Sequence, residues 1–262
     1  MSAARIEAVI RRHWYVTIHS PTRLIELGFW PVVDLVLWGL ITTFLLGAGA
    51  ELPVPVSFFL GAVIMWDLVF RSKNAVALCL LEEAHSRNLI SMFASPVTPT
   101  EYLTGAVAWG LTKVAWTWTV MALLAFGLFH FGVFQVGPIL AVYAAILIVY
   151  GISLALVVIG CVLRLGYAAD ELTWALAGLV VPFSAVFYPV TSLPGWAQAI
   201  ATIVPPAHVF ESLRATIAGE PAAWGSLPAA AGLAVLYLGL GFAFARAMFM
   251  DLLRRGSITR YM

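Results

Sequence analysis

The sequence has 262 residues, of which 62% are hydrophobic and only 10% are charged, and its mean hydropathy is +0.97. A soluble domain has roughly 45–50% apolar and about 25% charged residues, so this chain lacks the polar side chains needed to cover a water-facing surface. The composition excludes a soluble enzyme, a disordered chain and a nucleic-acid-binding protein, and it indicates a membrane protein. Because the net charge is only +1, function depends on where the charges lie.

The first 20 residues predict an amphipathic helix. Apolar residues such as Ile6 and Val9 recur at three- and four-residue spacing, opposite Arg5, Arg11 and Arg12. A helix with this pattern lies flat in the interface between membrane and water. We therefore expect residues 1–20 to form an interfacial helix that precedes the first membrane span.

Six stretches are long and apolar enough to cross a bilayer, which needs about 20 mostly apolar residues per helix. They run over about 24–47, 54–71, 103–129, 137–163, 172–189 and 228–250. Together they predict an all-α polytopic membrane protein, in which a bundle of six transmembrane helices occupies 24–250 of a single domain, 1–262. The tail over 251–262 follows the sixth span.

The connection over about 72–102 contains a second amphipathic segment, LLEEAHSRNLISMF. Proline removes a backbone donor and disfavours helix in the residue before it, so Pro96 and Pro99 must end this helix. A new helix then starts at Thr100, with Glu101 near its positive end. On the amphipathic segment we expect Leu81, Ala84, Leu89 and Met92 to face apolar matter, and Glu82, Glu83, His85 and Arg87 to face water.

The connection over about 190–227 predicts two short helices, over about 194–203 and 206–218. Both are too short to cross a bilayer, so we expect them to dip into the outer leaflet and return. Tryptophans at the headgroup level would hold them there. The residues that mark this predicted re-entrant region are Pro194, Trp196, Pro205, Pro206 and His208.

Basic residues are distributed unequally between the two ends of the predicted bundle. The connections at one end contain only Arg214. Cytoplasmic segments of membrane proteins carry an excess of lysine and arginine, so the other end, with both termini, is predicted to be cytoplasmic. The basic residues at that end are Arg5, Arg11, Arg12, Arg23, Arg71, Lys73, Arg87, Arg164, Arg246, Arg254, Arg255 and Arg260.

Three ionisable residues, Asp34, Asp67 and Lys113, lie within or near the ends of apolar spans. Each such charge costs roughly 2.5–3.5 kcal/mol and needs a partner. Asp67 can pair with Arg71 four residues on, and Lys113 can lie against Trp109. We further hypothesise that Asp34 pairs with Lys113. Two interpretations stay open: these residues fix helix packing, or they form part of a substrate or proton path.

The sequence lacks the motifs of nucleotide hydrolysis and of intramembrane catalysis. A phosphate-binding loop needs a lysine after a glycine, whereas Lys73 follows Ser72 and Lys113 follows Thr112. No HExxH motif occurs, and none of the five histidines lies in the middle of a predicted span. We therefore expect no catalytic residue, no metal site and no cofactor bound by this chain. Detection of a labelled covalent intermediate or product would be the evidence for the alternative of an intramembrane enzyme.

Two stretches, taken together, resemble a known family. LLEEAHSRNLISMFASPVTPTEYLTG resembles the cytoplasmic loop of type-2 ATP-binding-cassette (ABC) exporter permeases, in which paired acidic residues precede a short coupling helix. FSAVFYPVTSLPGWAQAIATIVPPAHVFESLR resembles the same family's fifth span leading into outer re-entrant helices. The sequence departs from the family after the acidic pair, where His85 to Leu89 stand in place of the common Gly-Thr-(Leu/Ile)-Glu run.

The resemblance implies that a separate ATPase grips the cytoplasmic helix and rocks the spans as it closes on ATP. It further implies two permease copies, which we expect to form a homodimer, and two ATP-binding subunits that bind ATP and Mg²⁺. We expect such a permease to lie in a bacterial inner membrane and to export an amphiphilic, lipid-linked, polysaccharide or drug-like substrate. The residues that the resemblance assigns to ATPase coupling are Glu82, Glu83, His85, Arg87, Leu89 and Met92.

The alternative to an ATP-driven exporter is an ion-coupled secondary transporter. Asp34, Asp67 and Lys113 would then be the coupling sites. Against it, the spans show no matched interruptions in two halves of the chain, which are typical of many such transporters.

Overall fold

The computed structural model describes residues 2–47, 56–86, 88, 91, 95–166, 171–221 and 223–255. Every regular element within these residues is helical, so the predicted all-α class is confirmed. In chain order the α-helices are α1 (Ala3–Ile18), α2 (Pro21–Gly47), α3 (Val56–His85), α5 (Pro99–Phe129), α6 (Ile139–Leu165), α7 (Leu172–Val180), α8 (Gly195–Ala201), α9 (Pro205–Ile217) and α10 (Leu227–Arg255). Short 3-10 helices lie at η1 (Val133–Val136), η3 (Val181–Phe183) and η4 (Val190–Ser192).

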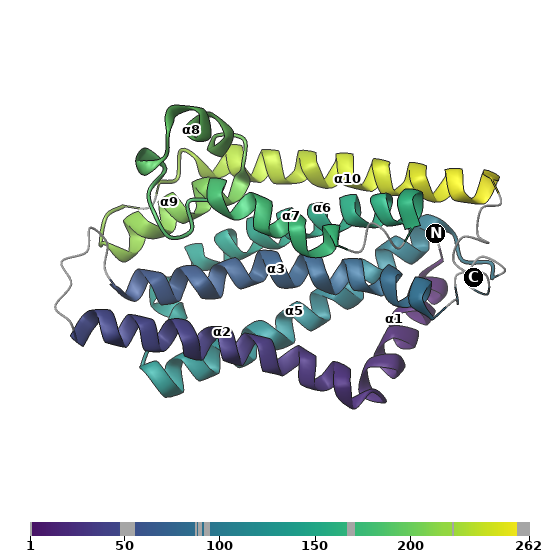
Figure 1. Ribbon diagram of the computed structural model, residues 1–262, viewed down its shortest axis with the longest axis horizontal. Helices are drawn as coiled ribbons and strands as arrows, with labels where there is room; N and C mark the ends of the chain where they lie inside the picture. Colours follow the sequence, from purple (N-terminus) through teal and green to yellow (C-terminus); the bar gives the residue numbers. More distant parts are fainter. Residues whose placement is uncertain are drawn as a thin grey trace.

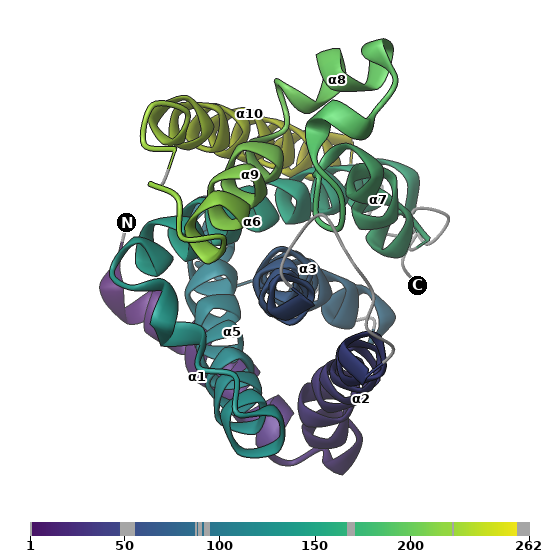
Figure 2. The ribbon, with the colours of Figure 1, turned by 90° about the vertical axis from the view of Figure 1, so that its left-hand side faces the viewer.

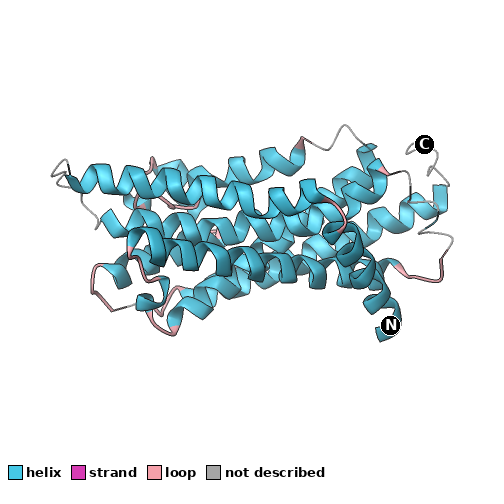
Figure 3. Cartoon of the chain, turned by 90° about the horizontal axis from the view of Figure 1, so that it is seen from below, coloured by secondary structure: helices cyan, strands magenta, loops and turns pink. Residues whose placement is uncertain are grey.

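The long helices run side by side along the long axis of the molecule (Figure 1 and Figure 3). Figure 2 looks along this axis and shows α3 between α2, α5, α6 and α7. Helix α1 and the C-terminal end of α10 lie at one end of the bundle, whereas α8 and α9 lie at the other. This arrangement puts the predicted inner and outer connections at opposite ends.

Four helices are long and apolar enough to cross a membrane: Pro21–Leu45 of α2, Pro99–Phe129 of α5, Ile139–Leu165 of α6 and Leu227–Arg254 of α10. They coincide with four of the six predicted spans. The most apolar 18-residue window of α6 is 78% buried inside the protein, whereas that of α2 is only 18% buried. An apolar helix with so much uncovered surface needs an apolar solvent, so this is a multi-pass membrane protein.

The second predicted span is part of a longer helix. Sequence alone predicts a span over 54–71 and a separate amphipathic helix after it. Instead, α3 is one helix of 30 residues that runs from Val56 to His85. The polar residues after Phe70 do not end the helix because neighbouring helices bury them. Ser72, for example, is fully buried and donates a 2.6 Å hydrogen bond to the Leu68 carbonyl within the same helix.

The fifth predicted span, 172–189, is not one continuous helix. Helix α7 has 9 residues and rises about 14 Å at 1.5 Å per residue, well short of a bilayer core of about 30 Å. The chain passes through η3 and then turns at Ala185, whose φ of 52° is left-handed. Pro182 contributes to this interruption because it cannot donate a helical hydrogen bond.

Glycines let α3 and α5 approach their neighbours closely. A Cβ at Gly151 of α6 would lie 2.6 Å from the carbonyl oxygen of Val69 in α3. A Cβ at Gly105 of α5 would lie 2.7 Å from Cγ1 of Val9 in α1. Small residues at such crossings are typical of helix packing in membranes, where dispersion contacts rather than the hydrophobic effect hold helices together.

Helix α1 has the amphipathic character that the sequence predicts, and part of its apolar face lies on the protein. Val9, His13 and Thr17 are buried, and Trp14 makes an edge contact with Trp109 of α5 at a ring distance of 5.7 Å. Its position relative to a membrane surface remains a prediction.

Candidate functional site at the α1 end of the bundle

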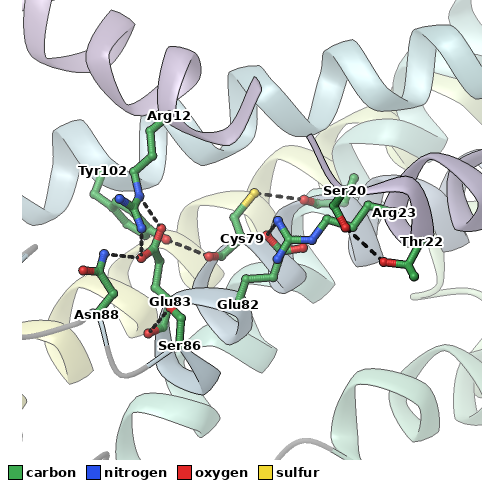
Figure 4. Close-up of polar contacts among 11 residues, drawn as sticks. Arg12, Ser20, Thr22, Arg23, Cys79, Glu82, Glu83, Ser86, Asn88 and Tyr102 are labelled. Atoms are coloured by element: carbon green, nitrogen blue, oxygen red, sulfur yellow. Dashed lines mark hydrogen bonds and ion pairs between the residues drawn. The ribbon is translucent and has the colours of Figure 1, made fainter. Parts of the chain in front are cut away.

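The last turn of α3 carries two adjacent carboxylates, Glu82 and Glu83. The helix macrodipole disfavours negative charge at a C-terminus, so both carboxylates need cationic partners. Glu83 is almost fully buried. The guanidinium of Arg12 binds it with two hydrogen bonds of 2.7 Å, one to each carboxylate oxygen, and Asn88 donates a third of 2.8 Å (Figure 4).

The bidentate contact joins α1 to α3 across 71 positions of sequence. Its hydrogen bond to Glu83 raises the pKa of the Arg12 guanidinium. The next residue of α1, His13, is buried, and burial lowers its pKa to about 4. This histidine is therefore neutral at pH 7, which keeps a further positive charge out of the contact between α1 and α5.

Glu82 has a partner on the preceding helix of the chain, α2. Arg23 at the start of α2 lies 3.2 Å from it, measured between Nη1 and Oε2 (Figure 4). The side chains of both residues are about one-quarter to one-third exposed. The pair fixes the beginning of α2 beside the end of α3.

Glu101 completes the cluster from the first turn of α5. It closes a capping box with Thr98, whose backbone N–H donates to Oε2 at 2.9 Å. The Ser2 N–H donates to Oε1 at 2.7 Å, and Arg5 lies 3.5 Å from Oε2. We name the three ion pairs Arg5–Glu101, Arg12–Glu83 and Arg23–Glu82 the inner ion-pair cluster.

The inner ion-pair cluster corrects the prediction that Glu83 faces water. Glu83 is buried because Arg12 reaches it from α1, and Glu82 is partly covered. Leu81, which we expected to face apolar matter, is buried in the core. The other residues assigned to ATPase coupling lie outside the described residues, or have a side chain outside them; they are His85, Arg87, Leu89 and Met92.

The intramembrane charges form one predicted pair and not another. Asp67 accepts a 2.9 Å hydrogen bond from Arg71, as their spacing predicts. The predicted contact of Lys113 with Trp109 also forms, with the ammonium 5.9 Å from the ring centroid. The hypothesised pair of Asp34 with Lys113 is wrong: Asp34 lies 3.8 Å from Arg71 instead. Asp34 and Lys113 nevertheless line the same cavity.

The predicted outer helices form at the opposite end, as α8 and α9. Pro194 precedes α8, and Pro205 and Pro206 begin α9, where proline is well suited to the first turn. Trp196 is exposed, and the His208 ring lies 2.9 Å from the Thr202 carbonyl. Whether these helices dip into a bilayer remains a prediction.

Sequence reasoning missed the arginines of the inner ion-pair cluster as partners of the acids. It placed Arg5 and Arg12 on a water-facing surface of the N-terminal helix. The low number of charged residues was the available signal. Because acidic and basic residues predicted at the same end of the bundle had few other possible partners, ion pairs between them could have been predicted. Among the described residues, no group of three or more histidine, cysteine, aspartate or glutamate side chains could hold a metal ion.

The fold and the uncovered apolar helices define a helical, multi-pass membrane protein. Comparison with known families specifies it further, because the family model described as ABC-2 type transporter matches residues 5–218. The chain belongs to the ABC-2 type transporter family. Members of this family are membrane components without an ATPase of their own, and they pair with an ATP-binding subunit. No curated protein matches the chain.

Proposed function

We propose that this chain is the permease subunit of an ATP-driven exporter in a bacterial inner membrane. In this proposal α3 is the second of six spans, and α7 with η3 contributes to the fifth. Both termini are cytoplasmic. The family match supports the class, and the concentration of basic residues at the end that carries α1 supports the orientation.

The inner ion-pair cluster carries the proposed mechanism. Two permease copies, as a homodimer, pair with two ATP-binding subunits, which bind ATP and Mg²⁺. Those subunits press on the segment after α3, where the coupling residues lie. Because Glu82, Glu83 and Glu101 are tied to arginines of α1 and α2, a displacement there moves α1, α2, α3 and α5 together. The substrate is an amphiphile: a lipid-linked or polysaccharide-bearing molecule, or a drug-like lipophile.

Orientation and partnership are tested first. In a variant with both native cysteines replaced by alanine, Ser86→Cys and Thr191→Cys place single thiols at exposed positions near opposite ends. A membrane-impermeant maleimide added to intact cells is expected to label only the second. Affinity purification is expected to recover an ATP-hydrolysing subunit. Labelling of Ser86→Cys from outside, or purification without any such subunit, would overturn the proposal.

Coupling is tested by exchanging charges. Glu83→Arg faces Arg12 with a like charge, so we expect export to be lost while ATP hydrolysis by the complex and membrane insertion continue. The exchange Arg12→Glu with Glu83→Arg restores the pair and is expected to recover part of the export. Glu7→Arg is the matched control, because Glu7 is exposed on α1. Normal export by Glu83→Arg would contradict the coupling role.

The same assay separates the exporter from a secondary transporter. Proteoliposomes that hold the permease alone, with an imposed proton gradient, are expected to show no transport. Transport under those conditions would favour ion coupling and would point to Asp34, Asp67 and Lys113 as its sites.

A further inference from the structure

A cavity of about 280 Å³ lies beside the inner ion-pair cluster. Its lining comes from the end of α1, the first half of α2, the second half of α3, the middle of α5 and the start of α7, and Figure 2 shows the last four of these helices around one region. Three basic side chains line it: Arg23, Arg71 and Lys113. A cavity with three cations inside an otherwise apolar bundle is costly unless something compensates them.

Carboxylates compensate two of the three cations. Arg71 contacts Asp67 and Asp34, and Arg23 contacts Glu82. For Lys113, no ion pair forms among the described residues, and its ammonium lies over the Trp109 ring. The three carboxylates equal the three cations in number, but none of them contacts Lys113, so its ammonium is the cation of the lining that an added anion can bind.

Polar atoms without partners converge on the same cavity. Asn74 Oδ1 and Thr117 Oγ1 are buried and make no hydrogen bond, and both residues line it. Thr117 is only 2% exposed and Asn74 only 8%. Buried polar atoms are nearly always hydrogen-bonded, so two such atoms around one space indicate a polar occupant. The Asn74 carbonyl oxygen requires a donor such as a hydroxyl, and the Thr117 hydroxyl can donate to an acceptor oxygen.

The remaining walls suit the apolar part of an amphiphile. Trp30, Phe70 and Trp174 line the cavity, and both tryptophans are more than half exposed. Aromatic rings at the edge of a charged cavity can cover an acyl chain or stack on a sugar while the charged group is held inside.

We propose that this cavity binds the anionic headgroup of an amphiphile, with a phosphate or similarly charged group held by Lys113 and Arg71 and a neighbouring hydroxyl held by Asn74 and Thr117. The inference rests on the proposed export function only where it identifies this amphiphile with the cargo. Its chemistry, an oxyanion with an adjacent hydroxyl, is shared by lipid headgroups and free phosphate, and the experiment separates these sources.

The test uses the purified full chain in detergent without any ATPase. Binding is measured by native mass spectrometry and by the ligand-dependent shift of the thermal unfolding midpoint. The probes are phosphatidylglycerol, diacylglycerol and inorganic phosphate. Phosphatidylglycerol is expected to bind, whereas diacylglycerol, which lacks the anion, is not.

Two variants and a control sharpen the result. Lys113→Gln removes the unpaired charge and is expected to weaken phosphatidylglycerol binding about tenfold, as for loss of one charge-assisted hydrogen bond. Thr117→Val keeps the shape but removes an orphaned hydroxyl, so the ligand-free protein should unfold at a higher temperature while the lipid-induced shift becomes smaller. Arg164→Gln, an exposed basic residue at the end of α6, should change neither quantity.

Equal binding of diacylglycerol, or an unchanged affinity in Lys113→Gln, would overturn the proposal and leave a cavity that holds water only. If inorganic phosphate binds as tightly as the lipid, the apolar part of the ligand contributes nothing, and the proposal that the ligand is an amphiphile is overturned. Because no ATPase is present, none of these outcomes bears on whether the chain is an exporter. Conversely, lipid binding in a chain that fails the partnership test would leave the site standing without the export function.

Discussion

The Arg12–Glu83 pair predicts an unequal response to removing either partner. The two side chains differ in exposure, 46% for Arg12 and 4% for Glu83. Arg12→Gln leaves a buried carboxylate with Asn88 as its remaining side-chain donor. Glu83→Gln leaves a guanidinium that can turn to water. The first variant should therefore be the more destabilising, although both break the same ion pair.

The expected magnitudes follow from burial. Removing one partner of a fully buried pair costs about 3–5 kcal/mol. Since water reaches part of this site, we expect Arg12→Gln to lower the free energy of unfolding by about 2–3 kcal/mol and Glu83→Gln by about 1 kcal/mol. The control is Glu7–Arg11 on the same helix, with both side chains more than half exposed and a 2.6 Å contact. Arg11→Gln should cost at most about 0.5 kcal/mol.

The measurement is reversible unfolding in mixed micelles with increasing dodecyl sulfate, followed by tryptophan fluorescence. Equal losses in Arg12→Gln and Glu83→Gln would refute the reasoning from burial. A loss in Arg11→Gln as large as in Arg12→Gln would show that α1 contributes through surface charge rather than through its contact with α3.

Three further outcomes are expected. The pKa of His13 falls from 6.5 to about 4 on folding, so the unfolded chain binds more protons between these values. Acidification from pH 7 to pH 5 should therefore lower the free energy of unfolding of the unsubstituted protein by about 2 kcal/mol more than it lowers that of the His13→Phe variant. Parallel curves of unfolding free energy against pH for the two proteins would contradict this. Gly105→Leu should push α1 off α5 and speed tryptic cleavage within α1, whereas Gly127→Leu, with open space around it, should not; equal cleavage rates would count against close packing. Thr98→Ala should cost about 1 kcal/mol in the same unfolding assay through loss of the helix cap, while Thr98→Ser should retain most of it; equal costs would argue against the cap.

Long apolar runs made four helices predictable from sequence, since nothing but a membrane span accommodates them. The extension of α3 was not predictable in the same way. The polar run at Arg71 to Asn74 is typical of a membrane boundary, and only the neighbouring helices reveal that these side chains are packed inside. The short α7 was equally hidden, because hydropathy does not report that Pro182 and the turn at Ala185 interrupt the helix.

The candidate site was predictable in its residue types and location, but not in its pairings. The sequence identifies the acids at the end of α3 and the charges within the spans. It does not indicate that Arg12 binds Glu83, because contacts between residues so distant in sequence leave no local pattern. Local spacing did predict the Asp67–Arg71 pair, four residues apart on one helix.

The long sequence separation of the α1 contacts imposes an order on biogenesis. The Ser2 backbone cannot meet Glu101 until the chain has grown by 99 residues beyond Ser2. At roughly 5–20 residues per second, this delay lasts about 5–20 s after the amino terminus emerges. During that interval Arg5 of α1 lacks its partner Glu101, and the contact between α1 and α5 forms only when the third long helix has been made.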